Sequence, residues 1–125
     1  MLPRLSNVPQ LNNVVSDYLS ELQKQHFEGD IASNYADRLS LATDNSVYQQ
    51  LPQAILFPKS VADVVRITKL ANKEKYLHLT FTPRGGGTGT NGQSINNNII
   101  VDLSRHMTGI LKLNIEERWV RVQAG

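Results

Sequence analysis

One stretch of this chain combines residue types that are suited to binding an anion. Residues 83–94 read Pro-Arg-Gly-Gly-Gly-Thr-Gly-Thr-Asn-Gly-Gln-Ser and contain five of the eight glycines. Glycine adopts positive φ without a Cβ clash and lets another molecule approach the backbone closely. Such a run can turn several backbone N–H groups toward one point and form a nest for a phosphate. Arg84 would add a fixed positive charge at the mouth of that nest.

The stretch therefore predicts a phosphate-bearing cofactor held mainly by backbone groups, with hydroxyl and amide side chains around it. The candidate cofactor-binding residues are Arg84, Gly85, Gly86, Gly87, Thr88, Gly89, Thr90, Asn91, Gly92, Gln93 and Ser94. A cluster of this composition can also be an ordinary loop. The apolar segments Tyr76–Phe81 and Ile99–Val101, which flank it and are both predicted strands, favour a ligand site, because tight loops between buried strands commonly bind ligands.

Two familiar phosphate-binding patterns can be tested against this stretch. Residues 87–92 match G-x-G-x-x-G, but the dinucleotide fingerprint needs a helix at the last glycine and an acidic residue about 20 positions later. The next residues, Gln-Ser-Ile-Asn-Asn-Asn, are typical of a turn, and Asp102 comes too early. Residues 87–94 nearly match the P-loop pattern, but Gln93 replaces its lysine, which argues against phosphoryl transfer.

The composition excludes several other kinds of site. The chain has 125 residues, 40% of them hydrophobic, which fits one small domain or a piece of one. Its net charge is +2 and its basic residues are scattered, which argues against nucleic-acid binding. Without cysteine, the chain can form no disulfide, thiolate nucleophile or cysteine-ligated metal centre. His26, His78 and His106 lack metal-ligand spacing, so we expect no metal site.

The expected location is the cytoplasm, with peripheral attachment to the inner membrane as a further possibility for the parent protein. No apolar run approaches the ~20 residues that span a bilayer. The N-terminus has no apolar segment of the secretory kind.

The elements that position the stretch can be read from periodicity and from capping residues. Apolar residues recur at helical spacing between Leu11 and Leu22 and predict an amphipathic packing helix. Ile31–Ala36 is predicted as a short helix, and residues 44–46 as a turn whose side chains bond nearby backbone N–H groups. We assign residues 1–50 to an N-terminal helical extension and residues 51–125 to the first half of a cofactor-binding domain.

The second segment reads as a strand–helix–strand unit followed by the glycine-rich stretch. Ala54–Phe57 is a short apolar strand between prolines, and Ser60 can cap a helix that starts at Val61. Tyr76–Phe81 would be the second, parallel strand, and the glycine-rich stretch would then follow its carboxyl end, where ligands bind in α/β sheets. Because helices and strands are mixed in this order, the fold class is α+β with an α/β-like core.

The last part of the chain reads as further strands. After Ile99–Asp102, residues 110–115 and 119–123 alternate in polarity and predict two half-buried strands joined as a hairpin by residues 116–118. The chain stops at Gly125, directly after a strand, so we expect it to be a fragment of a longer protein.

Several of these segments together resemble those of a known family. The chain is similar to the N-terminal part of oxidases and dehydrogenases with the vanillyl-alcohol-oxidase, or PCMH, type of FAD-binding domain. It most resembles bacterial FAD and iron–sulfur dehydrogenases of the D-2-hydroxyglutarate type. The matching segments are Pro52–Val64, Arg84–Gly89, Val101–Arg105 and Val120–Gly125, with Asp44–Tyr48 similar to the segment ahead of the first strand in the 2-hydroxyacid branch.

The resemblance implies specific roles for these residues. Arg84–Gly89 would donate backbone N–H groups to the FAD pyrophosphate, and Thr90–Ser94 would line the cofactor nearby. The stretch has no histidine, so noncovalent FAD is expected. The family fold holds FAD between two subdomains, of which this chain would supply the first. The catalytic residues, the 2-hydroxyacid site and any 4Fe-4S cysteines would lie in the rest of the polypeptide, so the isolated chain would be inactive and could self-associate.

Two alternatives remain open from the residues alone. The chain could be a noncatalytic protein-interaction module, with the N-terminal helix as its docking face and a structural glycine loop. It could also be an enzyme acting on another phosphate ligand, such as a sugar nucleotide, with Asp102 and His106 as an acid–base pair. For these two residues, a turn-capping Asp102 and a solvated His106 are the simpler expectation.

Overall fold

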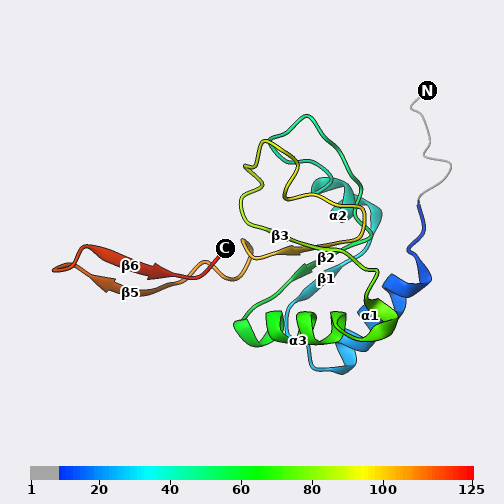
Figure 1. Cartoon of the computed structure of the whole chain (residues 1–125), viewed down its shortest axis with the longest axis horizontal. Coiled ribbons are helices and arrows are strands. Elements are labelled where there is room, and N and C mark those ends of the chain that lie inside the picture. The colour runs from blue at the N-terminus through cyan, green and yellow to red at the C-terminus, as the bar shows by residue number, and fades with distance from the viewer. Residues whose placement is uncertain (1–8) are drawn as a thin grey trace.

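A computed structural model describes residues 9–125, so part of the predicted N-terminal extension, residues 1–8, lies outside the described residues. The described part holds a four-stranded sheet with helices on both sides and a separate two-stranded hairpin (Figure 1). The elements are α1 (Asn13–Lys24), β1 (Asp30–Ala32), α2 (Tyr35–Ser40), β2 (Ala54–Phe57), α3 (Val61–Ala71), the 3₁₀ turn η1 (Glu74–Tyr76), β3 (Phe81–Arg84), β4 (Ile99–Asp102), β5 (Ile110–Asn114) and β6 (Trp119–Val122).

The sheet is mixed and its order is β1-β2-β4-β3. β2 and β3 both pair with β4 in parallel, and β1 pairs with β2 in the antiparallel sense. The predicted strand–helix–strand unit with parallel strands is therefore confirmed, with β4 inserted between its two strands. The α+β class predicted from the sequence is also confirmed.

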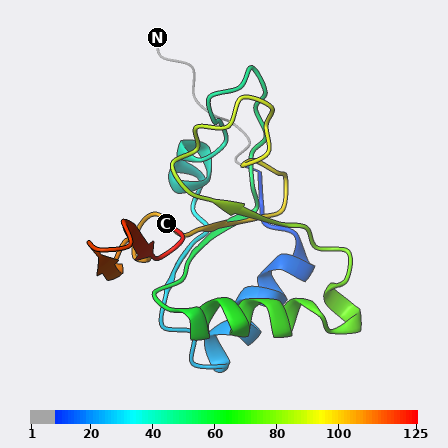
Figure 2. The ribbon, with the colours of Figure 1, turned by 60° about the vertical axis from the view of Figure 1, so that its left-hand side comes forward.

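α1 and α3 cover one face of the sheet and form the main core with it (Figure 2). The Asn12 side chain caps α1 by accepting a hydrogen bond from the Val14 N–H. The apolar face of α1 is buried, and the Tyr18 hydroxyl donates to the Ile67 carbonyl of α3 at 2.9 Å. The prediction of a packing helix between residues 11 and 22 is confirmed. In the described part of the chain, no helix is both long and apolar enough to cross a membrane.

The opposite face of the sheet carries a smaller core and α2. Asn34 caps α2 through a hydrogen bond from the Asp37 N–H. The Arg38 side chain of α2 is buried, and its Nε donates to the Pro52 carbonyl at 2.7 Å. Burial holds the pKa of Arg38 below its ordinary value. This contact ties α2 to the segment that leads into β2.

The predicted short helix at Ile31–Ala36 was wrong. Its first two residues belong to β1, where Ile31 pairs with Leu56 of the neighbouring strand. The helix begins only at Tyr35, after its Asn34 cap. Pairing with an available sheet edge, which local sequence does not reveal, outweighs the weak helical preference of so short a segment.

The predicted strand at Tyr76–Phe81 was also wrong in its placement. Tyr76 closes the η1 turn, and its ring packs edge-on against Tyr18, with 5.1 Å between ring centroids. β3 starts only at Phe81 and runs to Arg84. It is the last strand of the described sheet, which explains why Pro83 is tolerated within it.

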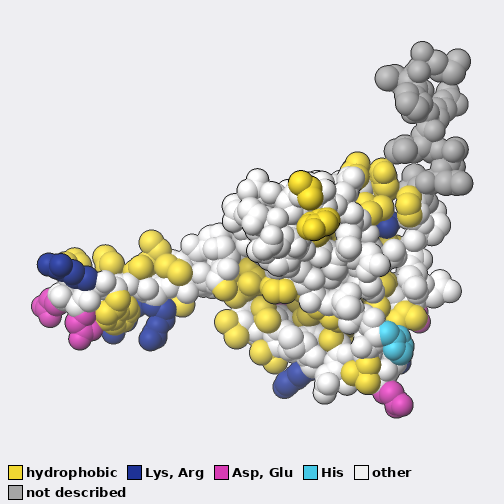
Figure 3. Space-filling view, turned by 45° about the horizontal axis from the view of Figure 1, so that its top comes forward, with side chains coloured by type: hydrophobic (Ala, Val, Ile, Leu, Met, Phe, Trp, Pro, Cys, Tyr) yellow, Lys and Arg dark blue, Asp and Glu magenta, His cyan; other side chains and the backbone are white. Residues whose placement is uncertain are grey.

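The hairpin β5–β6 projects from the body of the molecule (Figure 1). The predicted strands are present, but their predicted half-burial was wrong. Leu113 is 65% exposed and Ile115 is 79% exposed, and hydrophobic side chains lie along the surface of the projection (Figure 3). Alternating polarity predicted strands correctly, but no element of residues 9–125 covers either face.

Candidate cofactor site at the glycine loop

The glycine loop, residues 85–94, leaves the carboxyl end of β3 and returns to β4. Ligands of parallel α/β sheets bind beyond the carboxyl ends of strands, so the loop stands at the expected position. The longer loop between α2 and β2 lies beside it in both ribbon views (Figures 1 and 2). Of the predicted site residues, Arg84, Gly85, Gly87, Gly89 and Gly92 are half-buried, Ser94 is buried, and Gly86, Thr88, Thr90, Asn91 and Gln93 are exposed.

Six consecutive backbone N–H groups of the loop have no protein acceptor in the described part of the chain. Those of residues 85–90 donate to no acceptor among residues 9–125. A Cβ added at Gly85 would meet open space, and one at Gly86 would only touch Thr88 at 3.5 Å. The residues thus fit a group such as a pyrophosphate, which needs several N–H donors and a close approach to the backbone.

Two other glycines shape the loop itself. Gly87 and Gly92 have φ of +67° and +75°, in the left-handed region that side chains disfavour. A Cβ at Gly87 would also collide with the Arg84 guanidinium. Glycine is therefore needed at both positions for the observed backbone, independently of any ligand.

Arg84 contacts two parts of the site region. Its guanidinium rests against Gly87, and its Nη1 donates to the Thr43 carbonyl at 2.9 Å. Gln93 is likewise used within the loop, because its Oε1 accepts from the Asn91 N–H at 3.0 Å. The side chains left on the exposed surface of the loop are the hydroxyls of Thr88 and Thr90 and the amide of Asn91.

The 43–48 loop, residues Thr43 to Tyr48, is hydrogen-bonded to the glycine loop, a contact that the sequence did not reveal. Its Asn45 N–H donates to the Gly87 carbonyl at 3.0 Å. The Ser94 hydroxyl donates to Asp44 Oδ2, also at 3.0 Å. Asp44 Oδ1 accepts from the Ser46 N–H at 2.9 Å, which confirms the predicted turn. Hydrogen bonds from Ser46 and Ser94 hold the pKa of Asp44 below its ordinary value.

Asp102 and His106, which the alternative of another phosphate enzyme would use as an acid–base pair, have other partners. Asp102 Oδ1 accepts from the N–H and the hydroxyl of Ser104 and so caps a turn, as expected. His106 is not simply solvated, which corrects that expectation: its Nε2 lies 2.6 Å from Asp30 Oδ2. This bond is the first cause of the lowered pKa of Asp30. Residues 9–125 contain no group of three or more His, Cys, Asp or Glu side chains placed to hold a metal.

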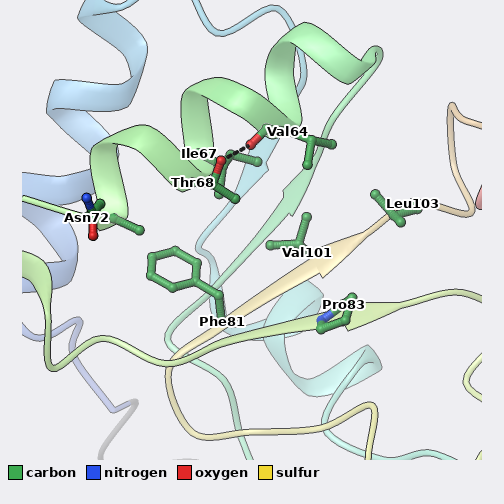
Figure 4. A pocket seen from close by; sticks show the side chains of 9 residues that line it. Val64, Ile67, Thr68, Asn72, Phe81, Pro83, Val101 and Leu103 are labelled. Carbon is green, nitrogen blue, oxygen red and sulfur yellow. Dashed lines mark hydrogen bonds between the residues drawn. The ribbon is translucent and has the colours of Figure 1, made fainter.

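A separate apolar groove lies between α3 and the sheet (Figure 4). Its volume is about 450 Å³, and Val64 and Thr68 of α3 face Phe81 and Pro83 of β3 across it. None of its lining side chains is charged. The groove therefore has no charged group to attract a phosphate, and the glycine loop remains the candidate cofactor site.

Several known proteins are similar to this chain in sequence. D-2-hydroxyglutarate dehydrogenases of Haemophilus influenzae and Escherichia coli are 79% and 57% identical to it over all 125 residues. A mitochondrial D-lactate dehydrogenase [cytochrome] of Saccharomyces cerevisiae is 30% identical over 110 residues, which are 78% of this chain and 18% of that protein. The chain spans 12% of the length of the two bacterial relatives.

Solved structures share the fold. An alkyldihydroxyacetonephosphate synthase matches with a TM-score of 0.71 and 19% identity over 89% of this chain and 22% of that one. The wild-type BBE-like 1 protein of Physcomitrella patens matches with a TM-score of 0.58 and 18% identity, over 80% of this chain and 21% of that one. The model of the family described as FAD binding domain matches residues 52–125, so this chain belongs to that family and FAD is its cofactor.

Proposed function

We propose that the glycine loop binds the pyrophosphate of FAD, and that this chain is the pyrophosphate-binding part of a D-2-hydroxyacid dehydrogenase. The observation that carries the proposal is the row of six N–H groups of residues 85–90, without protein acceptors in the described residues, on a loop open to close approach. Relatives named D-2-hydroxyglutarate dehydrogenase, 79% and 57% identical over the whole chain, support a 2-hydroxyglutarate-like substrate for the parent protein.

The role of this chain in such an enzyme is to bind and orient. When bound, FAD supplies the capacity to accept a hydride equivalent from a 2-hydroxyacid. The loop N–H groups donate hydrogen bonds to the pyrophosphate oxygens, and the missing Cβ atoms of Gly85 and Gly86 leave room for that approach. Arg84 links the loop to Thr43 and places a positive charge next to Gly87.

The remaining functions belong to the rest of the parent polypeptide. We place the catalytic residues, the 2-hydroxyacid site and any 4Fe-4S centre there, because this chain has no cysteine and its Asp102 and His106 are engaged elsewhere. The isolated chain would then be inactive. The cytoplasm remains the expected location, and the assignment of residues 1–50 to an extension of the domain remains a prediction.

The alternative of a noncatalytic interaction module has less support. Its docking face would be the apolar side of α1, but Val15, Tyr18, Leu19 and Leu22 are buried in the core of the chain itself. The helix therefore has no free apolar stripe to offer to a partner.

The absorption spectrum of the full-length parent protein tests the proposed function. The glycine loop contains no histidine, cysteine or tyrosine to carry a covalent flavin. We expect a flavin spectrum in the purified protein and its complete release into the supernatant on acid precipitation. A colourless protein that does not take up added FAD would refute the proposal, and flavin retained in the precipitate would refute noncovalent binding.

A further inference from the structure

The 43–48 loop holds the glycine loop near both of its ends. Near the start, Arg84 Nη1 donates to the Thr43 carbonyl and the Asn45 N–H donates to the Gly87 carbonyl. At the end, the Ser94 hydroxyl donates to Asp44 Oδ2. The partners of the two side-chain bonds are 41 and 50 positions apart in the sequence. These contacts therefore come from tertiary structure and not from the local geometry of a turn.

The contact at Gly87 orients a peptide group of the loop. In a trans peptide the C=O and N–H point in opposite directions. Because the Gly87 carbonyl points to the Asn45 N–H, the Thr88 N–H of the same peptide group points away from the 43–48 loop. This N–H is one of the six without a protein acceptor among residues 9–125. The 43–48 loop thus sets the direction of a donor that the proposed site needs.

Asp44 acts on the site through Ser94 and not as a ligand. A carboxylate would repel a pyrophosphate, and both carboxylate oxygens of Asp44 are already used by Ser46 and Ser94. Ser94 is only 8% exposed, so its hydroxyl is directed inward to Asp44. An Asp carboxyl is ionised at neutral pH, and the hydrogen bonds from Ser46 and Ser94 lower the pKa of Asp44 further.

A run of glycines has little conformational preference of its own, so an unrestrained loop would lose entropy when it binds a ligand. Restraint before binding removes part of that loss and increases affinity. We propose that Asp44 and Ser94 are positioning residues of the cofactor site, and that their hydrogen bond holds the glycine loop in the conformation that receives the FAD pyrophosphate. This inference rests on the proposed function.

A double-mutant cycle in the full-length parent protein tests the pair. The apoprotein variants are Asp44→Ala, Ser94→Ala and the double substitution, and the measurement is the Kd of FAD by flavin fluorescence. Each single substitution should raise the Kd of FAD about tenfold. The Kd of the double variant should not exceed the larger of the two single-variant values, because both substitutions remove the same hydrogen bond.

Three comparison variants make the outcomes distinct. Asp17→Ala removes an exposed carboxylate of α1 and should leave the Kd unchanged. Ser94→Thr keeps the hydroxyl and should restore most of the affinity lost in Ser94→Ala. Gly86→Val tests the glycine loop itself.

If Gly86→Val weakens FAD binding while Asp44→Ala and Ser94→Ala do not, the positioning role is overturned and the proposed function stands. Additive effects of the two single substitutions would also overturn a shared hydrogen bond. If all three variants bind FAD as the wild type does, the proposed function fails as well. Ser94→Ala removes one oxygen atom and leaves Asp44 with Ser46, so it decides the question even if Asp44→Ala does not fold.

Discussion

Individual residues of the glycine loop have different physical tasks. Gly87 and Gly92 are required by the positive φ of the loop, whereas Gly85 and Gly86 leave the surface open. The position of this loop after a strand could be predicted from the sequence, because glycine spacing is a local property, whereas its binding of an anion stays a prediction. The partner of Arg84 could not be predicted, because Thr43 lies 41 positions away and only the fold brings the two together.

Asp63 of α3 has a carboxylate that is fully buried. Its Oδ1 accepts from the Glu28 N–H at 3.1 Å and from Arg66 Nη1 at 3.0 Å, and its Oδ2 accepts from the Lys59 N–H at 3.0 Å. Its own N–H is capped by the Ser60 hydroxyl. One carboxylate therefore joins the start of α3 to the segment between α1 and β1.

Replacing Asp63 by Ala should lower the free energy of unfolding by about 3 kcal/mol, because buried donors lose their acceptor and Arg66 loses its partner. Urea unfolding of this chain followed by circular dichroism measures the change. Asp17→Ala, at an exposed position of α1, is the matched control. A loss below about 1 kcal/mol would show that water replaces these bonds.

At the scale of elements, α1 and the segment after α3 are joined by Glu21. Its carboxylate accepts from Lys73, from Lys75 at 2.6 Å and from the Tyr76 hydroxyl at 2.8 Å. The sequence indicated both helices, since apolar periodicity and caps are local signals. It misplaced the strand after α3, because the apolar run that contains Tyr76 is used to close the core under α1.

The Glu21 cluster predicts a pH dependence of stability. Hydrogen bonds from Lys73, Lys75 and Tyr76 lower the pKa of Glu21 from 4.5 to about 2. The Glu21 carboxyl therefore binds a proton less readily in the folded state than in the unfolded state. The stability contributed by ionised Glu21 is complete above pH 4.5 and is lost as the pH falls toward 2.

Glu21→Gln should therefore lower Tm at pH 7, and its difference from the wild type should shrink between pH 4.5 and pH 2. Thermal unfolding across this range measures the effect. For Glu28→Gln, at an exposed position, the Tm difference from the wild type should not shrink over this pH range. A Tm difference for Glu21→Gln that is constant with pH would contradict the assigned role of its charge.

At the scale of the whole molecule, two apolar surfaces lack a cover in the described residues. One is the projecting hairpin and the other is the groove between α3 and β3 (Figures 3 and 4). Strand alternation in the sequence indicated the hairpin but not its exposure, because burial depends on what packs against a strand. Relatives about eight times longer than this chain supply much more polypeptide that could provide such a cover.

We expect the 125-residue chain to self-associate when it is separated from the parent protein. Light scattering after size exclusion should give a mass above 14.0 kDa that rises with concentration. Ile115→Glu, on the exposed hairpin, should reduce association, and Glu116→Gln should not. A single mass of 14.0 kDa at every concentration would contradict the expectation.

The central claim is that the backbone of the glycine loop receives the FAD pyrophosphate. The most direct test is the Kd of FAD for Gly86→Val in the full-length parent protein, with Thr108→Val as the control at an exposed site outside the loop. The loop has room for a side chain at Gly86, so the variant should fold normally and bind FAD at least about tenfold more weakly. An unchanged Kd for Gly86→Val would show that FAD does not approach this backbone and would contradict the assignment of the site.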